Sequence, residues 1–197
     1  MKAKILTSAA GLAIAAGTGV AQADPVTWYI GGDVVQLETK VTDQTGVPPI
    51  ITGTARGSTL RLKGGLHILP WLDAEAQFIF PKESSFSTSG GVDNTVETSV
   101  LALFAKPNVN LGPVNLYGLV GIGASHYDFK GVVSTSDNGK TASDLAYGLG
   151  AQYKINRNFA VSLDWTHYGK KNFDLPGLPG GLDVEVNAVG LGVNYTF

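Results

Sequence analysis

Hydrophobic residues alternate with small or polar residues along the last ten positions of the chain. Val189, Leu191, Val193, Tyr195 and Phe197 share one parity, and small or polar residues occupy the positions between them. Side chains of a β-strand point alternately to opposite faces, so this pattern predicts a strand with one apolar face. A tilted strand of about ten residues is long enough to cross the core of a bilayer. The pattern therefore favours a membrane-spanning strand.

Seven further segments show the same period of two, with turn signals between them. No segment after residue 23 has the ~18 consecutive apolar residues of a transmembrane helix, and many of the 26 glycines lie inside apolar runs, where they would destabilise a helix. The segment 96–106 is apolar on both faces, so its orientation stays open. With the final strand these segments make eight, and an even number of strands is typical of outer-membrane barrels. The sequence therefore predicts an all-β protein, a closed, eight-stranded antiparallel transmembrane β-barrel. The seven segments are 28–37, 60–68, 72–80, 96–106, 116–129, 144–154 and 159–166.

The connections between these segments alternate in length. Long polar connections are expected after the first, third, fifth and seventh segments, at 38–57, 82–95, 130–141 and 169–182. The connections after the second, fourth and sixth segments are shorter. Outer-membrane barrels have short periplasmic turns and longer external loops, so both termini are predicted on the periplasmic side.

A soluble β-sandwich or a lipocalin-like barrel is the alternative, because both also contain strands of period two. Three observations favour the membrane barrel: the face opposite the apolar one is rich in glycine, alanine and serine with few lysines or glutamates, aromatic residues lie at the strand ends, and the final strand is apolar. Small residues suit a narrow lumen crowded by long charged side chains. Aromatic residues at the strand ends would form two interfacial belts. One predicted belt holds Trp28, Tyr29, Trp71, Tyr117, Tyr153, Phe159 and Tyr195, and the other Phe80, Tyr127, Tyr147 and Trp165.

The N-terminus has the features of a signal peptide. Lys2 and Lys4 precede an apolar stretch at 5–20, and Ala21-Gln22-Ala23 has the small-x-small form that signal peptidase cleaves. We therefore expect residues 1–23 to be a signal peptide and residues 24–197 to be the barrel domain. The alternative is an anchor that stays in the membrane.

Charge and cysteine content exclude several functions. Without Lys2 and Lys4, 12 basic residues stand against 16 acidic ones, and no basic stripe suggests nucleic-acid binding. The sequence has no cysteine and only three scattered histidines, which gives no metal-ligand spacing. We expect no cofactor and no metal.

Several motifs together resemble one family of proteins. They are Trp28-Tyr29-Ile30-Gly31-Gly32, the glycine-rich runs 116–121 and 147–153, and the closing run 190–197. The chain is similar to small outer-membrane β-barrel proteins related to the transmembrane domain of OmpA, OmpX and the opacity proteins, often labelled "porin family". This resemblance implies insertion by the barrel-assembly machinery, which reads a C-terminal strand ending in an aromatic residue. Tyr195 and Phe197 match that assembly signal.

Charged residues on the inward parity would share the lumen. If two strands pair around Pro70, His67 lies opposite Asp73 and Lys63 opposite Gln77. The mixed charges predict either a network of ion pairs that plugs the barrel or a narrow solute path, and eight strands leave little room for a pore. The expected polar network of the lumen contains Arg61, Lys63, Asp73, Glu75, Asp144, Lys154 and Asp164.

Catalytic arrangements find little support in the sequence. Outer-membrane lipid deacylases use a His-x-Ser pair, but in His167-Tyr168-Gly169 the serine position holds glycine. Ser125 and His126 are adjacent on a predicted strand, so their side chains point to opposite faces. The sequence predicts no catalytic residue, and His167 is assigned to the interfacial belt.

The expected function is a non-catalytic structural or surface-interaction role in the bacterial outer membrane. The alternative is a narrow channel or conduit for small solutes. Expected partners are outer-membrane lipid and lipopolysaccharide, the barrel-assembly machinery and an extracellular ligand bound by the long loops. Lys170 and Lys171 are predicted to lie near anionic lipid phosphates.

Overall fold

The described part of the chain folds as a set of long β-strands. The computed structural model describes residues 27–43, 52–87, 93–130, 139–175 and 178–197, so the expected signal peptide lies outside the described residues. These residues form eight strands, and they contain no helix that could span a membrane. The strands are β1 (Trp28–Asp43), β2 (Thr52–Leu69), β3 (Leu72–Ser87), β4 (Asp93–Leu111), β5 (Val114–Lys130), β6 (Gly139–Lys154), β7 (Phe159–Leu175) and β8 (Leu178–Thr196).

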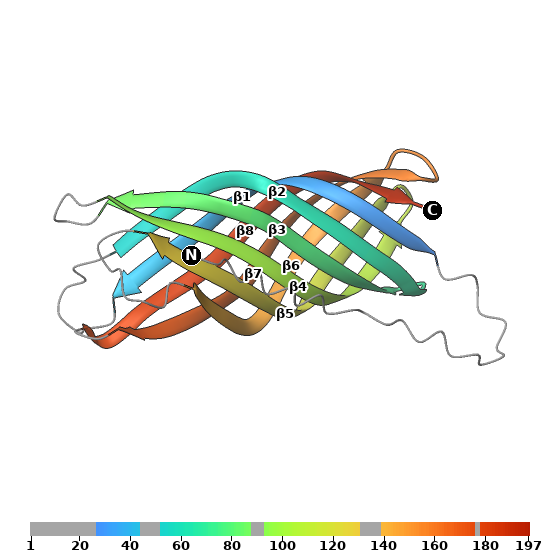
Figure 1. Cartoon of the computed structure of the whole chain (residues 1–197). Coiled ribbons are helices and arrows are strands. Elements are labelled where there is room, and N and C mark those ends of the chain that lie inside the picture. Colours follow the sequence, from blue (N-terminus) through green and yellow to red (C-terminus); the bar gives the residue numbers. More distant parts are fainter. Residues whose placement is uncertain (1–26, 44–51, 88–92, 131–138, 176–177) are drawn as a thin grey trace, which may run out of the picture.

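The strands close into a single antiparallel barrel, as the sequence predicts. Each strand pairs with its neighbour along the chain, and β1 pairs with β8 to close the sheet (Figure 1). Short turns at 70–71, 112–113 and 155–158 lie at the same end as Trp28 and Thr196, which we call the turn end. The opposite end is the loop end. Pairing of Lys63 with Gln77 and of His67 with Asp73 confirms the predicted register of β2 and β3.

The strands are longer than the sequence pattern indicates. Most of their extra residues lie at the loop end, where the chain was expected to form long loops, and β4 is also extended at the turn end, to Leu111. The connections at that end are reduced to 44–51, 88–92, 131–138 and 176–177. The alternation seen nearer the turn end fades there because the outward side chains become polar, but the backbone pairing of the strands continues.

The outer face carries the apolar side chains, which confirms the predicted orientation. Leu62, Phe78, Leu149 and Val193 are between 38% and 64% exposed, whereas Arg61 is fully buried. The apolar band covers the part of each strand next to the turn end. Beyond it the outward side chains become polar, starting with Gln36 on β1, Ser58 on β2, Ser143 on β6, His167 on β7 and Asn187 on β8.

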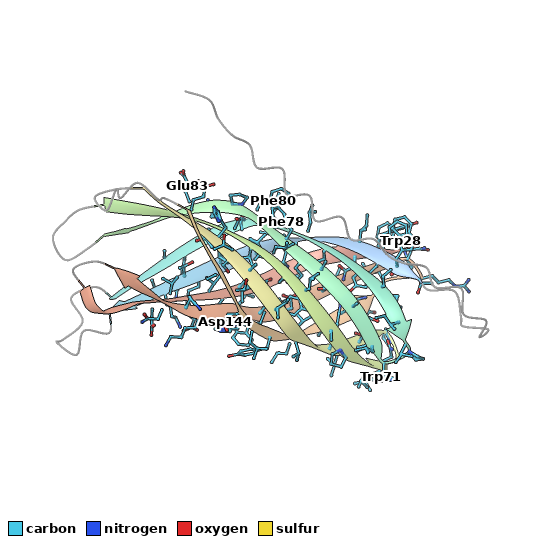
Figure 2. The ribbon with its side chains drawn as sticks, turned by 60° about the horizontal axis from the view of Figure 1, so that its bottom comes forward. Trp28, Trp71, Phe78, Phe80, Glu83 and Asp144 are labelled. Carbon is cyan, nitrogen blue, oxygen red and sulfur yellow. The ribbon has the colours of Figure 1, made fainter. Side chains whose placement is uncertain are left out.

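Aromatic side chains frame this band, with two corrections to the predicted belts. Figure 2 shows Trp28 and Trp71 toward the turn end and Phe78 and Phe80 nearer the loop end. Tyr29 and Tyr117 are instead buried inside the barrel, where their hydroxyl groups bind carboxylates. The side chain of Tyr127 lies outside the described residues. Tyr153 and Phe159 at the turn end, and Tyr147 and Trp165 nearer the loop end, are exposed as predicted.

Pairing between β6 and β7 stops halfway along the barrel. It runs from the turn end to Tyr147 and His167, whereas residues 139–146 pair only with β5 and the end of β7 pairs only with β8. Asp144 bridges the two edges, because its Oδ1 accepts from the amide of Leu145 (2.7 Å) and its Oδ2 from the amide of Lys170 (3.0 Å). Gly169 beside it has a φ of 133°, and a Cβ there would lie 2.7 Å from the Cβ of Asp144. Glycine therefore permits this bridge.

Candidate functional site: the barrel interior

Arg61 lies at the centre of a charged cluster that crosses the lumen. Its Nε donates to Asp33 Oδ2 (2.6 Å) on β1, and its Nη2 donates to both carboxylate oxygens of Asp164 (2.8 and 2.7 Å) on β7. Nη1 donates to the hydroxyl of Tyr168 (3.0 Å), which in turn donates to Gln77 on β3. One guanidinium on β2 thus links β1 and β3, its neighbours, to β7, which is about a hundred residues away in the sequence.

A second group of charges adjoins the first. Lys106 Nζ donates to Glu75 Oε2 (2.7 Å) and lies 4.2 Å from the centre of the Tyr117 ring. Tyr29 also donates to Glu75, and Gln77 Nε2 donates to Glu75 Oε1 (2.7 Å). Because Gln77 and Tyr117 also contact the first group, the two groups form one network.

Lys63 completes the charge balance of this network. Its Nζ lies 2.9 Å from Asp33 Oδ1 and donates to Ser162 Oγ (2.9 Å). Three cationic groups therefore face three carboxylates, and all six are buried. Buried charges are stabilised only when such partners are present. The "lumen network" is Asp33, Arg61, Lys63, Glu75, Lys106 and Asp164 with the polar side chains that bind them.

Three of the expected lumen residues lie outside the lumen network. Asp73 binds His67 Nδ1 (2.7 Å) near the turn end. Lys154 is exposed at the same end, where its Nζ donates to Asn110 Oδ1 (3.0 Å), since it is the last residue of β6. Asp144 has the inward parity but bridges the β6 and β7 edges instead, because the ladder between those strands has ended at that height.

Asp33 and Lys106 are central residues that the sequence analysis missed. Asp33 could have been found, since it is the inward neighbour of the outward Val34 in a segment that was correctly recognised. Lys106 could not be placed, because the segment 96–106 is apolar on both faces and its orientation was left open.

Glycines in the barrel wall make room for this network, as the sequence predicts. A Cβ at Gly150 would lie 2.5 Å from Cζ of Tyr117, and a Cβ at Gly65 would lie 2.3 Å from Cζ of Tyr29. A Cβ at Gly190 would lie 2.5 Å from Nη2 of Arg61. Gly150 and Gly65 therefore make room for a long side chain on the neighbouring strand, and Gly190 makes room for Arg61 on the next strand but one.

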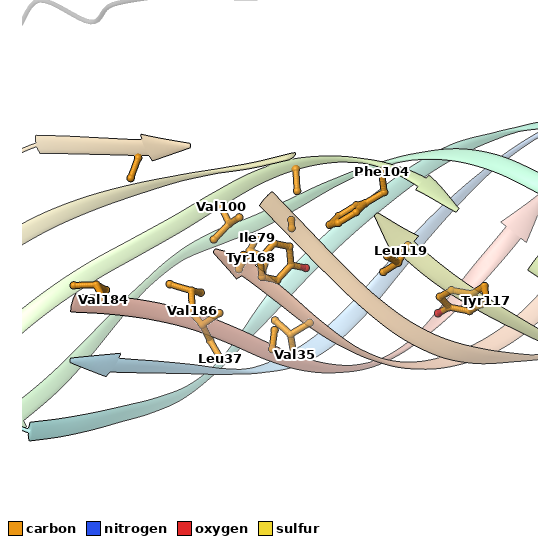
Figure 3. Packing of buried hydrophobic residues seen from close by; sticks show 14 residues of the cluster. Val35, Leu37, Ile79, Val100, Phe104, Tyr117, Leu119, Tyr168, Val184 and Val186 are labelled. Atoms are coloured by element: carbon orange, nitrogen blue, oxygen red, sulfur yellow. The ribbon is translucent and has the colours of Figure 1, made fainter. Parts of the chain in front are cut away.

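Apolar side chains fill the lumen on the loop side of the network. On β1 and β3 they follow a polar residue of the network in that direction: Val35 and Leu37 lie beyond Asp33, and Ile79 lies beyond Gln77. Figure 3 shows the packed cluster. This corrects the expectation of a lumen filled by small and ionic residues, because both faces of these strands are apolar. Further members are Val100, Ala102, Phe104, Leu119, Tyr168, Val184 and Val186.

The histidines form no catalytic or metal-binding arrangement among the described residues. His167 faces outward, packs against Tyr147 (4.8 Å between ring centres), and its Nδ1 lies 2.9 Å from Asn187 Oδ1. His126 lies 3.0 Å from Thr141 Oγ1. The described part of the chain holds no group of three metal-ligating side chains.

The outer surface at the loop end forms a polar collar. We use this name for the outward residues of β7, β8, β1 and β2 beyond the apolar band. Lys170 pairs with Asp183 (3.0 Å), and Glu38 pairs with both Arg56 (2.7 Å) and Lys40 (3.3 Å). Lys171 has the opposite parity because it pairs with the inward Val184. Only Lys170 of the two neighbouring lysines therefore has the outward parity, and their position near anionic lipid phosphates stays a prediction.

A closed barrel with an apolar outer band and a charged, filled lumen defines an integral membrane β-barrel. The chain belongs to the outer membrane protein β-barrel domain family, whose sequence profile matches residues 6–197. It is thus an outer-membrane β-barrel protein located in the bacterial outer membrane, surrounded by lipid and lipopolysaccharide. Short turns of such barrels are periplasmic, so we expect the polar collar to lie on the extracellular side.

Solved structures support the same fold. The structure of Ail, the attachment invasion locus protein of Yersinia pestis, in complex with the heparin analogue sucrose octasulfate, is 21% identical over 87% of this chain and 99% of that chain, with a TM-score of 0.53. OprG from Pseudomonas aeruginosa is 16% identical over 87% and 96%, with a TM-score of 0.61. Neisserial surface protein A is 15% identical over 86% and 97%, with a TM-score of 0.56. No curated relative has significant sequence similarity to the chain.

Proposed function

We propose that this protein is a non-catalytic, non-conducting barrel with a structural or surface-interaction role on the bacterial surface. The observation that carries the proposal is the burial of Arg61 on β2, which binds carboxylates on β1 and β7. Moving this guanidinium would leave Asp33 and Asp164 underneutralised at a buried site, which is energetically unfavourable. The apolar cluster above it excludes hydrated ions from the other half of the lumen.

The polar collar supports the surface-interaction part of the proposal. The strands run for 16 to 19 residues, whereas a tilted strand needs about ten to cross the bilayer. The remaining residues raise a rigid polar surface above the lipid, and rigid scaffolds of this kind present binding groups. Ail, a barrel of the same fold, binds a sulfated sugar in its complex. Insertion by the barrel-assembly machinery through Tyr195 and Phe197 is part of the same proposal.

Conductance tests the closed lumen. We expect refolded protein in planar lipid bilayers to give no steady unitary current. Discrete openings in the unaltered protein would contradict a closed lumen and favour the alternative of a narrow channel. The apolar half of the lumen makes a conduit for small uncharged solutes the second candidate, and liposome swelling in a small neutral solute tests it independently of ionic current.

Cysteine labelling tests the orientation of the collar, because the sequence contains no cysteine. We expect a membrane-impermeant maleimide to label Lys170→Cys on intact cells. Lys154→Cys at the opposite end should be labelled only after the outer membrane is permeabilised, and Leu149→Cys should be shielded by lipid. Labelling of Lys154→Cys on intact cells would contradict the proposed orientation.

A further inference from the structure

A hollow lies on the outer surface of the barrel where the apolar band meets the polar collar. It has a volume of about 260 Å³ and crosses four neighbouring strands, β7, β8, β1 and β2. Its lining combines one aromatic ring, one ion pair, two amides and two small apolar residues. These residues are Gln36, Glu38, Arg56, Trp165, Asn187, Ala188 and Val189.

The position of the hollow along the strands indicates which part of the lipid layer it faces. Toward the loop end, the outward residues change from apolar to polar between Val34 and Gln36 on β1 and between Val189 and Asn187 on the paired β8. Trp165 belongs to the aromatic belt that marks the upper membrane interface. The hollow therefore lies at the level of the lipid headgroups in the outer leaflet, directly above acyl chains that would contact Val189 and Leu191.

The lining is preorganised. The ring of Trp165 is held by an edge-on contact with Tyr147 (6.0 Å between ring centres) and remains 36% exposed. Asn187 is fixed by His167 (2.9 Å) and by its own bond to Glu185 (2.8 Å). Because these side chains are already held in place, they lose little further conformational entropy when a ligand binds.

Two polar groups remain available to a ligand. Gln36 is exposed, and its side chain makes no hydrogen bond to any residue that the structure describes. The guanidinium of Arg56 contacts Glu38 through Nε, and its side chain is 65% exposed. The hollow therefore offers an amide that donates and accepts and a guanidinium whose remaining N–H groups donate.

From these contacts we infer that the hollow binds the sugar headgroup of a glycolipid in the outer leaflet. A sugar presents hydroxyl groups that both donate and accept, matching Gln36, Glu38 and Arg56, and an apolar face that fits against the indole ring of Trp165. A phosphate group fits less well, because the Glu38 carboxylate is part of the lining and already pairs with Arg56, the cation of the lining, and with Lys40 beside the hollow. The acyl chains of the same lipid then follow the apolar band.

Tryptophan fluorescence tests this inference. Replacement of Trp28 and Trp71 by phenylalanine leaves Trp165 as the only one of the three tryptophans. In detergent micelles we expect a saturable change in its emission with lipid A and, within about twofold, with dephosphorylated lipid A. Phosphatidylglycerol, which carries a phosphate and no sugar, should produce no saturable change. Native mass spectrometry of the unaltered protein with the same lipids provides a second measurement that needs no tryptophan replacement.

Variants of the lining locate the binding site. Gln36→Ala and Arg56→Ala should each weaken lipid A binding by about fivefold to tenfold, since each removes hydrogen bonds to the sugar. Lys170→Ala is the matched control, because it removes a collar cation paired with Asp183 outside the hollow, and binding should be unchanged.

Three results would each overturn the inference: equal binding of phosphatidylglycerol, equal loss of binding with Lys170→Ala, or no binding of lipid A to the unaltered protein. All of them leave the proposed closed lumen untouched, because conductance does not depend on this surface.

Discussion

Replacing Arg61 with methionine gives the sharpest test of the lumen network. Methionine is close to arginine in length and retains most of the apolar stem, so the main change is the loss of the guanidinium. Three carboxylates then face only Lys63 and Lys106. We expect Arg61→Met to destabilise the barrel strongly while leaving its outer surface unchanged.

The magnitude follows from the contacts that are lost. Arg61 is fully buried and binds carboxylates on β1 and β7 as well as the hydroxyl of Tyr168. Removing one partner of a buried ion pair costs about 3–5 kcal/mol, because the other charge stays buried without compensation. Asp33→Asn added to Arg61→Met restores equal numbers of charges, so the double variant should recover at least about 1 kcal/mol of the lost stability.

Urea unfolding of protein refolded into phospholipid vesicles measures these differences. Lys154→Met is the matched control, since its exposed ammonium donates only to Asn110, and we expect a change within about 0.5 kcal/mol. A loss of less than about 1 kcal/mol for Arg61→Met would refute the reasoning. So would an Arg61→Met, Asp33→Asn double variant less stable than Arg61→Met alone.

Three further predictions concern other parts of the barrel. Gly150→Leu should cost about 1–3 kcal/mol in the same unfolding assay, because its side chain would collide with the ring of Tyr117, and an unchanged midpoint would contradict this. Asp144→Ala should accelerate hydrogen exchange at the amide of Lys170 by about tenfold, which mass spectrometry detects, because it removes the acceptor of that amide. Phe197→Ala should lower the amount of folded barrel in outer-membrane fractions, measured by heat-modifiable gel mobility, since its ring stack at the closing seam is lost; wild-type levels would argue against an assembly role.

The period of two predicts much of this fold because one face must meet lipid. Outward residues such as Leu149 and Val193 have to be apolar wherever the strand crosses the bilayer, so the alternation is strict there. The same constraint fixes strand number, register around Pro70 and the direction in which Arg61 and Glu75 point. These features could be predicted from the sequence.

The strand ends could not be predicted, because no lipid constrains them. Beyond the apolar band the outward face meets polar surroundings, and residues such as Lys40 and Lys170 are compatible with a strand or a loop. Hydrogen bonding between neighbouring backbones determines whether these residues form strand or loop, and the side-chain pattern does not reveal it. The collar and its hollow are built from this part of the chain, so the sequence pattern reveals neither.

The inward-facing residues are harder to predict than the outward ones, because the lumen can be filled either by charged pairs or by apolar contacts. A position can hold one member of a charged pair or one member of an apolar contact, provided that the opposite wall supplies the complement. β4 shows both: Val100 and Phe104 join the apolar cluster, while Lys106 on the same face pairs with Glu75. The partner that decides between them lies on another strand, so a single segment cannot determine its own inward residues. A correct lumen assignment therefore requires the register of all the strands first.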